Sequence, residues 1–172
     1  MSGIGHLAAG LSAKPAISKV PLWVLLIAGE TNDILYFAFT KLGIEQPVQM
    51  SMDFVHGVRY ATLAVNPWSH GLFMSLVWSF LAAVIAFLFY RDRKTSAGIG
   101  LVVFSHWALD FLMHSNLPLF FAGSTLVGLG LENSGAGLIF MTVLDIFLVV
   151  GGFAIYLVWK KRTATSDKKI SK

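Results

Sequence analysis

Three stretches of the chain are apolar over the length that a helix needs to cross a lipid bilayer. They cover residues 71–90, 97–115 and 137–159. A transmembrane helix takes about 20 predominantly apolar residues to span roughly 30 Å of hydrocarbon. Because only helices and closed barrels satisfy their backbone polar groups inside lipid, these stretches predict an all-α integral membrane protein. The composition agrees, since 13% of the residues are charged against about 25% in soluble domains.

A fourth stretch, residues 20–40, is apolar apart from a polar break between Glu30 and Asp33. Lys19 and Lys41 flank it at the distance expected for a transmembrane helix. A cleaved signal peptide is the alternative interpretation, but no small-residue cleavage site follows. We therefore expect a bundle of about four transmembrane helices that forms one membrane domain, residues 1–162.

The basic residues predict the orientation of this bundle. Short loops rich in lysine and arginine stay in the cytoplasm. With the N-terminus inside, 11 of the 13 basic residues fall on the cytoplasmic side, and only Lys41 and Arg59 fall outside. We expect both termini in the cytoplasm, with residues 163–172 as a disordered basic tail. Since the charges cluster at the ends of the apolar stretches, they indicate the lipid bilayer as partner and argue against nucleic acid.

Two long connections are predicted on the outer side. Residues 42–69 mix apolar and ionisable side chains, and we interpret them as a re-entrant or interfacial helix that ends before Pro67. Residues 116–136 are rich in glycine. Irregular backbone at membrane depth must be buried in protein or line a cavity. Both connections are therefore expected to fold over the outer mouth of the bundle.

Ionisable side chains occur inside the apolar stretches despite their cost. A charge at the centre of a bilayer costs about 2.5–3.5 kcal/mol even on the most lenient scale, so such residues indicate function by default. They are Glu30 and Asp33 in the first span, His70 at the mouth of the second, His106, Asp110 and His114 in the third, and Asp145 in the fourth.

The third span carries a pattern typical of metal ligands. His106, Asp110 and His114 are spaced four residues apart and so share one face of a helix. Each step rises about 6 Å, so one ion with bonds near 2 Å can hold two neighbours but hardly all three. Asp33 and His70 lie at a similar depth and would complete the site in the outer half of the bundle. Imidazole and carboxylate ligands, in a chain without cysteine, suit zinc, manganese or iron(II).

Several short motifs occur in a fixed order within residues 5–115. They are His6-Leu7, Asp33 at the close of the polar break, Trp68-Ser69-His70-Gly71, and Ser105-His106-Trp107-Ala108-Leu109-Asp110. Together they resemble a family of small bacterial inner-membrane proteins described as membrane-bound metal-dependent hydrolases. Residues 126–134 resemble a related subgroup described as membrane proteins or permeases. The chain lacks the proline that much of the family has before its aspartate, and Gly71 replaces a serine.

The resemblance implies a multi-pass protein of the bacterial inner membrane with a metal site. The family name suggests hydrolysis, although that name itself rests on the motif. We predict a metal-dependent hydrolase that acts on a lipid-derived or phosphoester substrate in the outer half of the membrane, with zinc as the expected divalent ion. The predicted roles are metal ligand for Asp33, His70, His106 and Asp110, general base for His114 or Glu30, and support of the ligands for Asp145, Ser69 and His6.

Simpler interpretations of these residues stay open. His106 and Asp110 would also suit a structural hydrogen bond between helices. His70 would suit an interface, His114 a solvated loop, and His6 the surface of a short interfacial helix.

Two other functions also stay open at this stage. An ion or solute transporter with an intramembrane His/Asp relay should extend its polar residues toward both faces, which the spans do not do. A non-catalytic subunit of a larger membrane complex would instead use His70 and His114 to bind haem or a pigment. A homo-oligomer is compatible with each of these functions.

Overall fold

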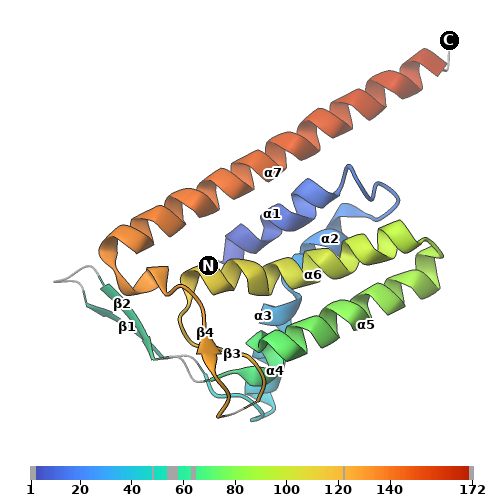
Figure 1. Cartoon of the computed structure of the whole chain (residues 1–172). Coiled ribbons are helices and arrows are strands. Elements are labelled where there is room, and N and C mark those ends of the chain that lie inside the picture. The colour runs from blue at the N-terminus through green and yellow to red at the C-terminus, as the bar shows by residue number, and fades with distance from the viewer. Residues whose placement is uncertain (1–2, 48, 54–57, 63–64, 122, 171–172) are drawn as a thin grey trace.

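The computed structural model of the chain describes residues 3–47, 49–53, 58–62, 65–121 and 123–170. Most of these residues are helical (Figure 1), so the predicted all-α class is confirmed. In chain order the elements are α1 (Gly3–Ala13), α2 (Leu22–Gly29), α3 (Thr31–Lys41), β1 (Gln49–Asp53), β2 (Val58–Thr62), α4 (Pro67–His70), α5 (Leu72–Tyr90), α6 (Arg93–Met113), β3 (Leu117–Pro118), β4 (Leu126–Val127), the 3-10 turn η1 (Leu131–Asn133) and α7 (Gly135–Ile170).

Among the described residues, three helices are long and apolar enough to cross a membrane. They are α5, α6 and the part of α7 from Gly135 to Ser166. α2 and α3 pass the same test together, but they are bent by 58° at the break between them. Large side chains such as Phe89 and Phe147 are exposed along α5 and α7, as expected of helices that contact lipid. The molecule therefore has three candidate spans, or four if the bent pair is one.

α5 and α6 run antiparallel as close neighbours, as the short connection between them predicted (Figure 1). Arg91 ends α5 in the left-handed region, with a φ of 52°. Asp92 then begins α6, because its side chain accepts a hydrogen bond from the backbone N–H of Thr95. The core beside this pair includes Val103 of α6 and Leu25 of α2.

The position of α1 decides between two interpretations of His6. The sequence left open whether His6 supports the ligands or lies on the surface of a short interfacial helix, but α1 packs between α7 and the pair α2 and α6, and His6 is 2% exposed. A Cβ on Gly10 would lie 2.6 Å from the backbone oxygen of Leu25, so only glycine lets α1 approach α2 this closely.

α1 runs from the end of the bundle near Asp110 toward the far end of α7 but covers only part of that distance. His6 lies beside Asp110, whereas Lys14 reaches the ring of Trp159, 5.0 Å away, near the far end of α7. The reason is the length of α1, since 11 residues extend only about 16 Å. α1 thus crosses half of the bundle. Which end faces the cytoplasm stays a prediction.

We call the end with Lys14, residues 91–94 and residues 160–162 the basic end, and the opposite end the cluster end.

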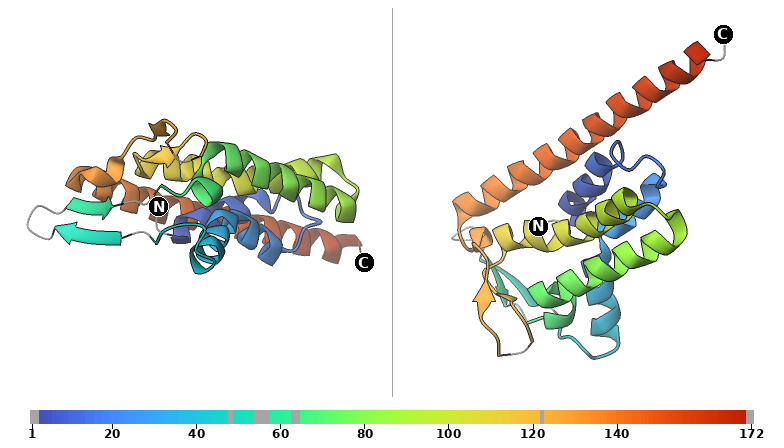
Figure 2. Two further views of the ribbon diagram at one scale, coloured as in Figure 1. Left: turned by 90° about the horizontal axis from the view of Figure 1, so that it is seen from below. Right: turned by 45° about the vertical axis from the view of Figure 1, so that its right-hand side comes forward.

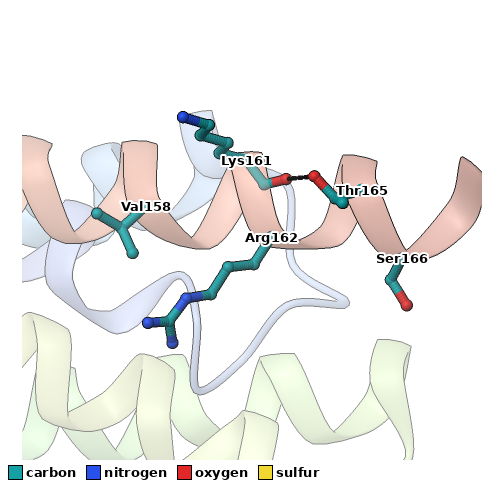
Figure 3. A pocket seen from close by; sticks show the side chains of 5 residues that line it. All are labelled: Val158, Lys161, Arg162, Thr165 and Ser166. Atoms are coloured by element: carbon teal, nitrogen blue, oxygen red, sulfur yellow. Dashed lines mark hydrogen bonds between the residues drawn. The ribbon is translucent and has the colours of Figure 1, made fainter.

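α7 continues beyond its predicted limit. Residues 163–170, predicted as part of a disordered tail, are helical, since no glycine or proline interrupts them. Figure 3 shows Lys161 and Arg162 lining an open hollow of this part of α7 with Val158, Thr165 and Ser166.

The described residues of the connection 42–69 do not form the helix that we predicted. β1 and β2 form an antiparallel hairpin, which projects from the cluster end (Figure 2). Pro67 does not end a helix but occupies the first turn of α4, where its missing N–H is not needed.

The second connection, residues 116–136, folds over the cluster end as predicted. β3 and β4 pair in a short hairpin, and Leu117 is 4% exposed. The backbone N–H groups of Leu129 and Gly130 donate to the carbonyls of Phe111 and His114. These bonds fasten the connection to the last turn of α6.

Candidate metal centre

Four histidines and two aspartates converge at the cluster end. Five of them lie within four different helices, and the sixth directly follows the last turn of α6. We call these six residues the His/Asp cluster. α1 contributes His6, α3 contributes Asp33, α4 contributes His70, α6 contributes His106 and Asp110, and His114 caps the C-terminus of α6.

The four predicted metal ligands lie within a few ångströms of one another. Asp33 Oδ1 is 3.3 Å from His70 Nε2 and 3.5 Å from His106 Nε2. Asp110 Oδ2 is 3.5 Å from His70 Nε2 and 3.3 Å from His106 Nε2. Tetrahedral zinc with bonds of about 2.0–2.2 Å separates its ligand atoms by about 3.3–3.6 Å. Each of these four separations therefore fits two neighbouring ligands of one ion.

The hydrogen bonding of His106 provides a second test of whether a cation fits. Its Nδ1 lies 2.8 Å from the carbonyl oxygen of Gly29, and because a carbonyl only accepts, Nδ1 carries the proton. In the neutral ring, Nε2 then presents a lone pair to the carboxylates of Asp33 and Asp110. This atom is fully buried and makes no hydrogen bond. A buried lone pair facing two carboxylates is unfavourable alone and favourable around a divalent cation.

His70 is oriented in the same way by two residues behind it. Ser69 Oγ lies 2.6 Å from Glu45 Oε2 and 2.8 Å from His70 Nδ1. The hydroxyl has one proton, and an ionised Glu45 can only accept it, so Ser69 accepts from the Nδ1–H of His70. Nε2 of the neutral ring then presents its lone pair to Asp33 and Asp110. Such partners, which set the tautomer of a ligand histidine, are typical of metal sites.

Glu45 is a functional residue that sequence reasoning missed. It is 3% exposed, and its Oε1 also accepts the backbone N–H groups of Trp68 and Ser69, at 2.9 and 3.0 Å. Glu45 thus holds the turn that carries His70. No sequence signal marks it, because a glutamate in a mixed connection is ordinary.

His6 belongs to the cluster itself and not to a layer behind it. Its Nε2 is 3.3 Å from Asp110 Oδ1, and its ring stacks on that of His106 with centroids 3.6 Å apart and planes inclined by 10°. Donor atoms of His6, Asp33 and His106 form one group that could hold a metal ion, and those of His70, His106 and Asp110 form another. The motif His6-Leu7 is the only sequence signal for this role.

His114, predicted as a general base, faces the same carboxylate. Its Nε2 is 3.7 Å from Asp110 Oδ1, and its Nδ1 is 2.7 Å from Glu132 Oε1. Glu132 is 2% exposed and was not singled out from the sequence. Because the carboxylate accepts, it fixes the proton of the neutral ring on Nδ1 and leaves the lone pair of Nε2 toward Asp110.

Two further predicted residues, Glu30 and Asp145, are not among the potential metal ligands of the described chain. Glu30 occupies the break between α2 and α3 and interacts electrostatically with Asp33, His106 and Asp110. Asp145 is 8% exposed on α7. It belongs to neither group of potential metal ligands within the described part of the chain, and its supporting role stays a prediction.

The cluster is closed on one side and accessible on the other. The side chains of His106 and Asp110 are 0% and 3% exposed, whereas those of Asp33, His70 and His114 are 31%, 16% and 19% exposed. A ligand would therefore reach the donor atoms from the side of α3, α4 and the end of α6.

Comparisons with protein-family models, curated proteins and solved structures find no match to this chain. Its class therefore rests on its own fold and chemistry. The molecule is a helical bundle with apolar helices long enough to span a membrane. It encloses buried histidines and aspartates that could hold a metal ion.

Proposed function

We propose that the chain is a membrane-embedded, metal-dependent hydrolase of the bacterial inner membrane, acting on a lipid-derived or phosphoester substrate. The observation that carries this proposal is the close spacing of donor atoms from Asp33, His70, His106 and Asp110. All-oxygen sites favour magnesium or calcium, whereas two imidazoles with two carboxylates favour zinc, with manganese or iron(II) as alternatives.

The ion would polarise a substrate oxygen and lower the pKa of a bound water to about 7, which provides a nucleophile at neutral pH. The residues of the chain perform the other tasks. Gly29, Ser69 and Glu45 hold two ligand histidines with Nε2 directed at the site. A general base must take one proton from the attacking water, and His114 with its partner Glu132, or Glu30, lies close enough to the cluster for this task.

The position of the cluster supports a substrate with a polar head beside apolar chains. The accessible side is that of α3, α4 and the end of α6, and α5, which directly follows α4, exposes Phe73, Leu76 and Phe80. A headgroup at the cluster and acyl chains along such a surface would satisfy both environments. Phosphoesters suit the site further, because metal ions neutralise the charge that develops on phosphoryl oxygens.

The distribution of buried ionisable groups favours hydrolysis over transport. In the described chain the cluster with Glu45 and Glu132 lies at one end, Asp145 is buried on α7, and at the basic end Lys14 is buried, with its Nζ donating to the carbonyls of Ser18 and Val20. A proton or ion relay needs polar groups that continue toward both faces.

Hydrolysis can be tested on detergent-purified protein stripped with a chelator and reloaded with zinc or manganese. The substrates are p-nitrophenyl phosphate, bis(p-nitrophenyl) phosphate and a diacyl phospholipid in mixed micelles. We expect metal-dependent turnover of at least one, lost in Asp110→Asn and kept in Asp92→Asn. Asparagine keeps the helix cap at position 92, so this control removes a carboxylate from the far end of the same helix. A metal-loaded protein that hydrolyses none of the three would refute the proposal.

A further inference from the structure

Asp110 directs its two carboxylate oxygens to two different sets of histidines. Oδ2 faces His70 Nε2 and His106 Nε2, at 3.5 and 3.3 Å. Oδ1 faces His6 Nε2 and His114 Nε2, at 3.3 and 3.7 Å. Every histidine of the described chain therefore approaches this one carboxylate, with two on each oxygen. One metal ion accounts for the two histidines that face Oδ2. It does not account for the two histidines that face Oδ1.

The stacking of His6 on His106 separates the two sets. A metal ion binds an imidazole nitrogen along its lone pair, in the plane of the ring. The two rings are nearly parallel, at 10°, and their centroids are 3.6 Å apart. An ion in the plane of His106 thus lies about 3.6 Å out of the plane of His6, well beyond a bond of about 2 Å. The distances alone would let His6 and His106 share one ion, but the nearly parallel rings do not direct both lone pairs at one point.

The set on Oδ1 has the features of a ligand set in its own right. Glu132 accepts from Nδ1–H of His114, so the Nε2 lone pair points toward Asp110. His6 and Glu132 are each 2% exposed. Nδ1 of His6 has no hydrogen-bond partner, so the contact of its Nε2 with Asp110 is the polar interaction that accompanies the burial of this ring.

We propose that Asp110 bridges two divalent cations, the second held by His6 Nε2, His114 Nε2 and Asp110 Oδ1. Three protein ligands leave a position open for water or substrate, as catalytic zinc sites do, whereas the first set offers four ligands. Pairs of ions about 3.5–4 Å apart are typical of sites that cleave phosphoesters. The inference rests on the proposed function for the first ion, and it strengthens the preference of the proposed hydrolase for phosphoesters. Because His114 becomes a metal ligand, Glu30 remains as the candidate general base.

The test counts metal ions and does not depend on turnover. Apo protein in detergent is saturated with zinc, freed of unbound metal and subjected to elemental analysis. We expect two zinc ions per chain in the wild type and in Asp92→Asn, and one in His6→Ala and in His114→Ala. If either alanine variant does not fold, Glu132→Gln replaces it, and we expect the second ion to bind about 10–100-fold more weakly.

Manganese-loaded wild type gives an independent measurement. Two ions bridged by a carboxylate give the electron paramagnetic resonance spectrum of a spin-coupled pair, and a single ion gives the spectrum of an isolated centre. One ion per chain, or an uncoupled spectrum at full loading, would overturn the second site and leave the hydrolase proposal standing. No bound metal would overturn both proposals. Two coupled ions without hydrolysis would support this site and refute only the hydrolase.

Discussion

The backbone carbonyl of Gly29 accepts a hydrogen bond from Nδ1 of His106, at 2.8 Å. α2 ends at Gly29, where backbone carbonyls lose their intrahelical partners. The break before α3 thus supplies the acceptor that fixes the tautomer of a ligand histidine. The same break directs Asp33, three residues beyond Glu30, toward the cluster. The bend of 58° is therefore part of how the site is built.

Gly29 should not tolerate a side chain. A Cβ at this position would lie 2.8 Å from the backbone oxygen of His6, so Gly29→Ala must displace α1 or α2. We expect metal affinity to fall about 10–100-fold, as for other losses behind ligand histidines. The control is Gly151→Ala on α7, where a Cβ meets nothing within 4 Å. Equal zinc affinities for the two variants, measured by competition with a chromogenic chelator, would contradict this account.

Asp110→Asn should abolish metal binding while the bundle still folds. Asparagine keeps the shape of the side chain. It removes the negative charge of Asp110, whose two oxygens face both pairs of histidines in the cluster. A ligand that binds only the folded state stabilises it by about 4 kcal/mol at 1,000 times its Kd. Added zinc should therefore raise the Tm of the wild type and of Asp92→Asn, but not of Asp110→Asn. Zinc stabilisation of all three proteins would place the metal elsewhere.

Ser69→Ala should weaken metal binding without removing a ligand. It leaves Nδ1–H of His70 without its acceptor and Glu45 without a donor, so the ring loses its fixed orientation. We expect a loss of about 10–100-fold in zinc affinity. Ser96→Ala is the matched control, because that hydroxyl donates to the backbone carbonyl of Asp92 at the basic end. An unchanged zinc affinity in Ser69→Ala would show that the Glu45–Ser69–His70 chain does not position the ligand.

Asp92 should make stability depend on acid pH. Hydrogen bonds from the side chain and the backbone N–H of Thr95 hold the pKa of Asp92 below its usual range. A carboxyl with a lowered pKa in the folded state contributes its full stabilisation above the unfolded value, about 3.9. That contribution disappears as pH falls through the lower folded value. The Tm of the wild type should exceed that of Asp92→Asn at pH 6, and the difference should shrink as pH falls below about 4. A constant difference would exclude this cause.

The predicted ligands could be read from the sequence because charges are costly inside apolar helices. Asp33 and Asp110 stand out for that reason, and the fourfold spacing of His106 and Asp110 places both on one face. The same reasoning cannot find Glu45 or Glu132. Both lie in connections where glutamates are common, and their partners are 24 and 18 residues away.

Two parts of the fold were not predicted, for different physical reasons. The segment Gln49-Met50-Ser51-Met52-Asp53 alternates polar and apolar residues, which is the period of a strand, yet the apolar content of residues 42–69 suggested a helix. The path of α1 depends on contacts with α2 and α7 that no local pattern encodes. A short apolar helix with one histidine is compatible with an interface as well as with a buried position.

The orientation of the bundle can be measured directly, since the chain has no cysteine. The positive-inside rule predicts that the basic end faces the cytoplasm. Thr163 lies at that end on α7, and Thr125 lies at the cluster end, and both are exposed. We expect Thr163→Cys in intact cells to resist a membrane-impermeant maleimide until the membrane is permeabilised, and Thr125→Cys to react at once. The reverse pattern would show that the bundle has the opposite orientation, with the cluster in the cytoplasmic half of the membrane. Reaction of both residues in intact cells would contradict a membrane crossing by α7.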